Sequence, residues 1–208
     1  MDSKKPLAFE CAKLIEEEGV SCALVGGVAV GVWTEERFTK DLDFALAVKS
    51  DQQAEKLIKA LLGKGYQIET VLEHKPTDSI AVAILSSPSE DSITHRIDLI
   101  FKQTGIEKEV VEGATIFELA RNQKFRVASV GHLIALKVLS MDDKTRPHDR
   151  LDIKNLIQAA DGEDIQVAKE AIALIEKRGF HQSKDLGSVL KTLLQIYQSK
   201  KQDFRLRR

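Results

Sequence analysis

Three aspartates stand where they could hold divalent cations together. Asp41 and Asp43 alternate with apolar residues over 41–48, which predicts a strand with both carboxylates on one face. Asp98 lies on the polar face of a second alternating segment, 94–101. Neighbouring carboxylates repel one another, and a cation relieves that repulsion. Because Mg²⁺ prefers oxygen ligands, the pattern indicates a magnesium site, in which two ions could activate an attacking oxygen and stabilise a leaving group.

A glycine pair precedes the first acid strand. Gly26 and Gly27 follow the apolar run 21–25, and the segment 28–33 after them has a helical pattern. Paired glycines let the backbone approach a ligand closely, and a helix N-terminus attracts phosphate. Gly-Gly turns and Asp-x-Asp pairs are each weak signals. Together, in the order turn, helix and acid strand, they become specific.

The run LVGGVAVGVWTEERFTKDLDFAL resembles the signature of the DNA polymerase β-type nucleotidyltransferases. Their pattern is an apolar residue, Gly-Gly or Gly-Ser, a spacer and Asp-x-Asp on a strand. The finer resemblance is to the AbiEii/AbiGii-like branch, bacterial proteins often found as toxins of toxin–antitoxin pairs. Its Arg-x-Thr-x-Asp-apolar-Asp string stands here at 37–43. The segment VGHLIALKVLSMDDKTRPHDRLDIKNLI resembles the same branch through its helix lysine and its Arg-Pro-x-Asp-x-x-Asp string.

The resemblance, which covers residues 22–157, implies a role for each matched residue. Gly26 and Gly27 would cradle the triphosphate of a nucleotide. Asp41 and Asp43 would bind the metal ions and act in catalysis. Asp98 would be the third catalytic acid, either the base or a metal ligand near the attacking hydroxyl.

Four further residues complete the expected site or compete for a place in it. Asp91 is the alternative to Asp98 as third acid, but its loop-like surroundings, SSPSEDS, favour Asp98. Arg37 and Thr39 would contact the nucleotide, although Arg37 could equally orient the carboxylates or form a structural salt bridge. Lys137 would reach a phosphate across the site, and the alternative is that its amine extends past an apolar helix stripe into water.

Regular elements must hold these residues in place. Hydrophobic periodicity predicts helices at 6–19, 28–33, 51–62, 114–121, 129–141, from 147, 164–178 and 184–199, and strands at 21–25, 42–48, 66–72, 79–85, 94–101 and 125–128. Ser50 or Asp51 and Ser129 are predicted helix N-caps, because their side chains can accept hydrogen bonds from free backbone N–H groups.

The order of these elements indicates an α+β fold in two parts. We expect a small mixed β-sheet nucleotidyltransferase core with flanking helices over residues 1–112. A mainly helical subdomain, packed on the core, would follow over residues 113–208.

Composition excludes several other classes of protein. The chain has 208 residues, 43% of them hydrophobic and 30% charged, and its formal net charge is −1, so the whole chain is not a basic nucleic-acid binder. No apolar run approaches the roughly 20 residues of a membrane helix, and the N-terminus shows no secretory signal, so we expect a cytoplasmic protein without a membrane partner. Two cysteines are too few for a disulfide framework, and no Cys/His cluster has zinc-ligand spacing.

These observations favour an enzyme that moves a nucleoside monophosphate from an NTP to a hydroxyl acceptor. The expected cofactor is Mg²⁺, as two ions, with Mn²⁺ as an alternative. The acceptor could be tRNA, a protein or a small molecule, and the resemblance alone adds a toxin role with an antitoxin as partner. The alternatives are a catalytically silent module that binds nucleotides or a partner on the same fold, and a structural protein whose acids only form salt bridges.

Overall fold

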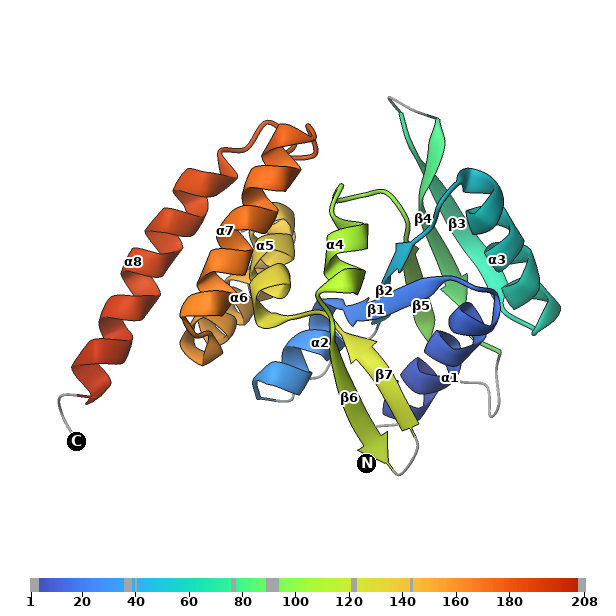
Figure 1. Ribbon diagram of the computed structural model, residues 1–208, viewed down its shortest axis with the longest axis horizontal. Coiled ribbons are helices and arrows are strands. Elements are labelled where there is room, and N and C mark those ends of the chain that lie inside the picture. The colour runs from blue at the N-terminus through green and yellow to red at the C-terminus, as the bar shows by residue number, and fades with distance from the viewer. Residues whose placement is uncertain are drawn as a thin grey trace. The chain divides into compact units, whose positions relative to one another are not determined.

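Residues 4–35, 39, 41–75, 78–88, 94–120, 123–142 and 144–205 are described by the computed structural model. Its contacts divide the chain into two units (Figure 1). Unit 1 comprises Met1–Ala29, Arg37–Gln103 and Glu107–Ala128, and contains the sheet. Unit 2 comprises Val30–Glu36, Thr104–Ile106 and Ser129–Arg208, and is helical.

Seven strands in the described residues form one mixed sheet: β1 (Ser21–Val25), β2 (Asp41–Ala47), β3 (Gln67–His74), β4 (Ser79–Ser86), β5 (Arg96–Ile100), β6 (Thr115–Ala120) and β7 (Gln123–Val127). Their order across the sheet is β3-β4-β5-β2-β1-β7-β6. β2 runs parallel to β5 and β1 runs parallel to β7, while the other neighbouring pairs are antiparallel. This arrangement confirms the predicted mixed sheet.

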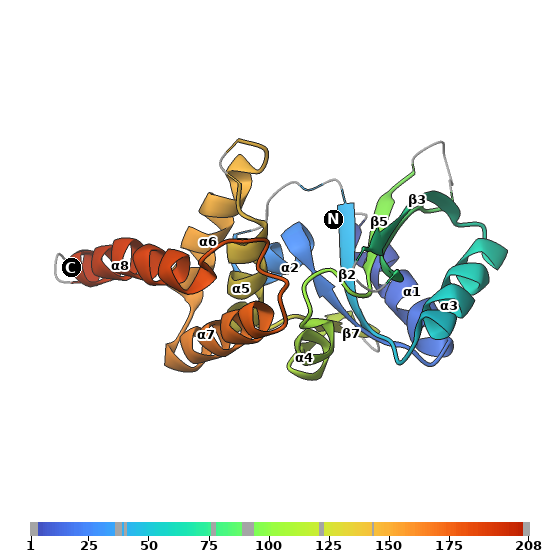
Figure 2. The ribbon, with the colours of Figure 1, turned by 90° about the horizontal axis from the view of Figure 1, so that it is seen from above.

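Three helices of unit 1 pack on the sheet: α1 (Lys4–Glu17), α3 (Asp51–Gly63) and α4 (Glu107–Glu112). Contacts join α1 to β1 and β7, α3 to β4, and α4 to β1 and β2. Figures 1 and 2 show α1 and α3 on one face of the sheet and α4 on the other. The predicted cap of α3 is confirmed, because the Ser50 side chain accepts from the Gln53 backbone N–H.

The core of unit 1 lies between the sheet and α1. Leu42, Phe44 and Leu46 are buried on one face of β2, with Leu24 and Cys22 beside them on β1. The Cys22 thiol donates to the Ala12 carbonyl of α1, which shows that α1 covers this face. The predicted alternation along β2 therefore has a physical basis, because one face of the strand meets a helix.

The predicted helix at 114–121 is wrong, because these residues form the edge strand β6. Thr115, Ile116 and Phe117 are β-branched or aromatic, types that fit a pleated surface. β6 pairs antiparallel with β7, and Phe117 lies opposite Phe125. Strand pairing outweighs the helical periodicity here. The sheet consequently includes residues up to Val127.

Unit 2 contains α5 (Val130–Ser140), α6 (Pro147–Ala159), α7 (Gly162–Lys177) and α8 (Leu186–Arg205). α5 contacts each of the other three helices, and α8 also contacts α6 and α7. Gly131 permits the close approach of α5 and α7, since a Cβ there would lie 2.4 Å from the Asp164 carbonyl oxygen. Ser129 is confirmed as the N-cap of α5, and Asp161 with Asp164 forms a capping box on α7.

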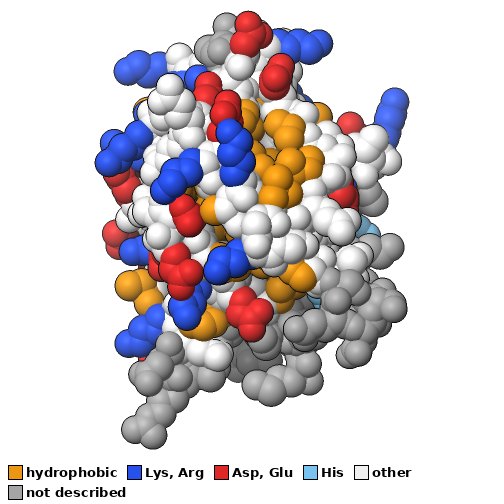
Figure 3. All heavy atoms as spheres, turned by 90° about the vertical axis from the view of Figure 1, so that its right-hand side faces the viewer, with side chains coloured by type: hydrophobic (Ala, Val, Ile, Leu, Met, Phe, Trp, Pro, Cys, Tyr) orange, Lys and Arg blue, Asp and Glu red, His pale blue; other side chains and the backbone are white. Residues whose placement is uncertain are grey.

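The surface of unit 1 that Figure 3 shows carries intermixed acidic and basic side chains beside a band of hydrophobic ones. This mixture agrees with the formal net charge of −1. In the described part of the chain, no helix combines the length and the apolar character needed to cross a membrane.

Candidate functional site

The two acids of β2 lie on the face of the strand opposite its large apolar side chains. Asp41 and Asp43 are both partly exposed. Leu42 and Phe44, which alternate with them, are 0% and 1% exposed. Because side chains alternate along a strand, β2 packs through its apolar face, and both carboxylates lie on the opposite surface of the sheet.

β5 brings the third acid beside β2. The two strands are parallel, with Asp43 opposite Asp98 and Asp41 opposite Arg96. Neighbouring strands lie about 4.8 Å apart, and residues in register on them share a face. The structure therefore brings Asp98 next to Asp43, although 54 residues separate them along the chain.

Gly26 lies under the carboxylate of Asp43. Its φ is +65°, a conformation that L side chains rarely adopt, and a Cβ at this position would stand 1.9 Å from Oδ2 of Asp43. β1 ends at Val25, which is opposite Asp43 in the ladder, so the turn after β1 is fixed beside the acids. Any residue other than glycine would have to displace the Asp43 side chain.

The helix α2 (Gly26–Trp33) begins at this turn. Gly27, its second residue, is buried. The first N–H groups of a helix have no partner within the helix and attract anions. The start of α2 beside the acid strand thus combines backbone donors with carboxylates, which is a suitable arrangement for a metal-bound phosphate.

Arg96 forms a two-pronged ion pair with Asp98. Its Nε donates to Oδ1 at 2.7 Å, and Nη2 donates to Oδ2 at 3.0 Å. This hydrogen bonding to Asp98 raises the pKa of the Arg96 guanidinium above its ordinary value, and the charges of Asp98, Asp41 and Glu69 act in the same direction. The guanidinium is therefore permanently charged and is surrounded by acidic groups.

The donor set of the acid face fits a hard divalent cation in its chemistry. Asp41, Asp43 and Asp98 supply only oxygen ligands, the type that Mg²⁺ prefers. Across the residues that the structure describes, however, no three His, Cys, Asp or Glu side chains are gathered as ligands of one ion. Asp98 is turned to Arg96 instead. The residues for a metal site are neighbours, but their carboxylates are not gathered around one point.

Among the other expected contacts to the nucleotide, Thr39 is the one that lies just before β2 within the described residues. Thr39 is partly exposed, two residues before Asp41. Arg37 lies outside the described residues, and so does Asp91, the competitor of Asp98. The contacts that we predict for these three residues stay predictions.

Lys137 lies in unit 2, where its amine joins two aspartates of α6. Nζ donates to Oδ1 of Asp149 at 2.7 Å and lies 2.8 Å from Oδ2 of Asp152. The Lys137 side chain is 11% exposed, so it does not extend into water. Ser140 donates to the other oxygen of Asp149, and Arg146 lies 3.9 Å from it. This buried cluster joins α5 to α6. Whether Lys137 also contacts a nucleotide stays a prediction.

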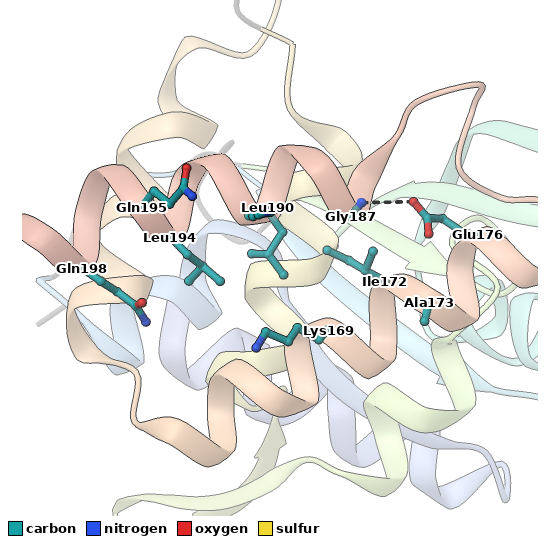
Figure 4. Close-up of a pocket in the computed structure, with 10 residues that line it drawn as sticks. Lys169, Ile172, Ala173, Glu176, Gly187, Leu190, Leu194, Gln195 and Gln198 are labelled. Atoms are coloured by element: carbon teal, nitrogen blue, oxygen red, sulfur yellow. Dashed lines mark hydrogen bonds between the residues drawn. The ribbon is translucent and has the colours of Figure 1, made fainter.

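Unit 2 also has a groove of about 750 Å³ between α7 and α8 (Figure 4). Its floor is apolar, with Ile172, Leu190 and Leu194 directed into it. Its acid, Glu176, accepts a hydrogen bond from the Gly187 backbone N–H at 3.1 Å. The groove thus lacks the paired carboxylates of the acid face.

The two thiols are unsuited to nucleophilic chemistry. Burial raises the pKa of Cys11 to about 12, against a smaller opposing effect of its hydrogen bond with Tyr66. Burial also raises the pKa of Cys22. The thiolate is the reactive form of cysteine, and both residues remain protonated in the folded core.

Arg96 and Asp152 have roles in the structure that the sequence did not predict. The alternation along this strand already predicts that Arg96 and Asp98 share one face, but not that they form an ion pair. Asp152 was visible only within the Arg-Pro-x-Asp-x-x-Asp string. Its burial at 1% exposure depends on how α6 packs, which local sequence does not determine.

The chain is similar to several known proteins. The family model described as "Nucleotidyl transferase AbiEii toxin, Type IV TA system" matches residues 14–207. No curated protein matches the chain. The crystal structure of an antigenic nucleotidyltransferase-like protein from Paracoccidioides brasiliensis is similar at a TM-score of 0.53, with 20% identity over 90% of this chain and 91% of that one. The lincomycin-bound lincosamide adenylyltransferase LnuA gives 0.46, with 20% identity over 77% and 99%.

Proposed function

Because the chain belongs to the family of AbiEii nucleotidyltransferase toxins of type IV toxin–antitoxin systems, we propose that its acid face transfers a nucleoside monophosphate from an NTP to a hydroxyl acceptor. The observation that supports this proposal most is the register between β2 and β5. It places Asp43 opposite Asp98, at the turn where Gly26 begins α2.

Each residue of the acid face has a distinct part in the proposed reaction. Asp41 and Asp43, together with one oxygen of Asp98, hold Mg²⁺, as two ions, or Mn²⁺ in its place. When bound, these cations supply positive charge that stabilises the reacting phosphate and the leaving pyrophosphate. Gly26 and Gly27 let the backbone approach the triphosphate.

The proposed transfer balances in one displacement. The acceptor oxygen forms a bond to the α-phosphorus, and the bond from that phosphorus to the bridging oxygen of the pyrophosphate breaks. Asp98 takes the proton of the hydroxyl, which requires a carboxylate within hydrogen-bonding reach of the acceptor. Since Asp98 adjoins Asp43, it is close enough to the metal ligands for this part.

The acceptor that we propose is a hydroxyl of tRNA, of a protein or of a small molecule. The net charge of −1 gives no strong preference for a polyanion. The family implies an antitoxin protein as a further partner and a toxin as the biological role. A cytoplasmic location, which we predict from the sequence, would supply both NTP and magnesium.

A catalytically silent module that binds nucleotides or a partner is the second candidate. The ion pair between Arg96 and Asp98 favours it, because a carboxylate held by arginine on both oxygens is not ready to accept a proton or a cation. The same acids could then bind a nucleotide without catalysing its transfer.

One labelling experiment separates the two candidates. The protein is incubated with Mg²⁺ and each NTP in turn, labelled at either the α- or the γ-phosphate, together with total tRNA or cell lysate. The proposal predicts that α-label enters an acceptor while γ-label appears only in pyrophosphate. Binding of NTP without transfer of either label would favour the silent module, and transfer of γ-label would indicate a kinase-like reaction instead.

A further inference from the structure

Arg96 is a cation on the acid face of Asp41, Asp43 and Asp98. It lies opposite Asp41 on the neighbouring strand and forms hydrogen bonds with both oxygens of Asp98. Glu69 of β3 adds a further negative charge that acts on the guanidinium. Arg96 therefore supplies a positive charge to Asp98 and beside Asp41, two of the acids that the proposed function assigns to the metal site.

The contact with arginine uses the oxygens that a metal would use. A guanidinium binds a carboxylate through two parallel N–H donors, one to each oxygen. A divalent cation is bound through the same carboxylate oxygens. With both oxygens hydrogen-bonded to Arg96, Asp98 is a weaker metal ligand, and the guanidinium charge repels a nearby cation, so the two cations compete for it.

Release of Asp98 by Arg96 is inexpensive in free energy. The Arg96 side chain is 44% exposed, so the guanidinium can turn into water without leaving a buried charge behind. Ion pairs with such exposure add little to stability, because water and salt screen them. Asp98 is only 17% exposed, so its carboxylate stays at the sheet when Arg96 leaves.

We infer that Arg96 is a positioning residue that holds Asp98 while the site lacks a metal and competes with a divalent cation for its carboxylate. This inference rests on the proposed function, because it takes Asp98 as a member of the metal site. In the resting protein the pair relieves repulsion among the acids. On metal loading, Arg96 releases Asp98 and the third carboxylate becomes available.

A purely structural role for Arg96 predicts the opposite effect on metal binding. If Arg96 only kept Asp98 correctly oriented, its removal would let the carboxylate adopt other orientations, and metal binding would weaken. If Arg96 competes, its removal takes away both a rival and a repelling positive charge, and metal binding becomes tighter. The sign of the change distinguishes the two roles.

The test is a titration of the nucleotide-free protein with Mn²⁺, in which free Mn²⁺ is followed by electron paramagnetic resonance. Arg96→Gln should lower the Kd for Mn²⁺ by a factor on the order of three to ten, the effect of removing one partly screened charge. Arg96→Lys keeps the charge but cannot make the two-pronged contact, and should lower the Kd by a smaller factor. Arg126→Gln is the matched control, because Arg126 is also a sheet arginine paired with an acid, Glu16.

A parallel titration of Asp43→Asn separates this inference from the proposed function. If Asp43→Asn weakens Mn²⁺ binding while Arg96→Gln leaves it unchanged or weaker, the inference fails and the metal site stands. If Asp43→Asn has no effect, the proposed metal site itself fails. Tighter binding in Arg96→Gln, with Arg126→Gln at the wild-type value, supports competition.

Discussion

The carboxylate of Asp43 lies directly over the α-carbon of Gly26. A Cβ on residue 26 would stand 1.9 Å from Oδ2 and 2.6 Å from the carboxylate carbon of Asp43. No side chain fits this space, so the position of the Asp43 carboxylate depends on a glycine in the turn that begins α2. A glycine and an aspartate that are 17 residues apart in sequence thus form one structural unit of the proposed site.

Gly26→Ala should reduce nucleotidyl transfer strongly, by about 100-fold or more, because the new methyl group displaces a metal-binding carboxylate. The left-handed backbone adds a stability cost of about 1–2 kcal/mol. The measurements are the transfer rate and the melting temperature. Gly63→Ala is the control, since a Cβ at Gly63 meets nothing within 4 Å. Full activity in Gly26→Ala would show that the close approach has no part in function.

Lys137→Met should destabilise the protein by about 3–5 kcal/mol. The substitution leaves Asp149 and Asp152, which are 4% and 1% exposed, without the cation between them. Chemical denaturation followed by circular dichroism measures the change. Lys191→Met, at an exposed position of α8, is the control and should change stability little.

A rescue variant checks the cause of that loss. Lys137→Met combined with Asp149→Asn and Asp152→Asn removes the excess negative charge and should recover part of the stability. If the single and triple variants are equally unstable, lost packing rather than unpaired charge explains the effect.

The cysteine thiols should be silent in the folded protein. Cys11, whose pKa burial raises to about 12, should not react with a thiol reagent at pH 8, and both thiols should react once the protein is unfolded in guanidinium. A rapid reaction of either thiol under native conditions would contradict the buried positions.

The same raised pKa predicts how stability depends on pH. The unfolded chain loses the Cys11 proton near pH 9.0, whereas the folded chain keeps it until about pH 12. The contribution of Cys11 is therefore complete below pH 9 and is lost as pH rises through this window. Replacement by serine or alanine should reduce the pH dependence of the unfolding free energy between these values.

The local patterns of the acid face could be predicted from the sequence, but its assembly could not. Alternation along 41–48 predicted that Asp41 and Asp43 share a face, because one face of β2 packs against a helix. That Asp98 lies opposite Asp43 follows from the pairing of β2 with β5, a contact between distant segments that periodicity does not encode. The strand at 115–120 was mistaken for a helix for the same reason, since its pairing with β7 outweighs its local pattern.

The cluster around Lys137 shows the same limit. A lysine beside an apolar helix stripe was identified, and two aspartates three residues apart were visible in the following segment. Their meeting depends on the packing of α5 against α6, which is tertiary structure. Sequence periodicity assigns each side chain to a face of its helix or strand, but the packing of these elements determines which side chains are in contact.

Transfer of α-labelled nucleotide by Asp43→Asn, compared with the wild type, tests the central claim most directly. Asparagine keeps the shape of the side chain and removes the charge that would hold the cation, so the fold should persist while transfer falls by about 1,000-fold or more. Asp51→Asn, in the first turn of α3, should retain wild-type transfer. Undiminished transfer by a correctly folded Asp43→Asn protein would contradict the assignment of this acid face as the active site.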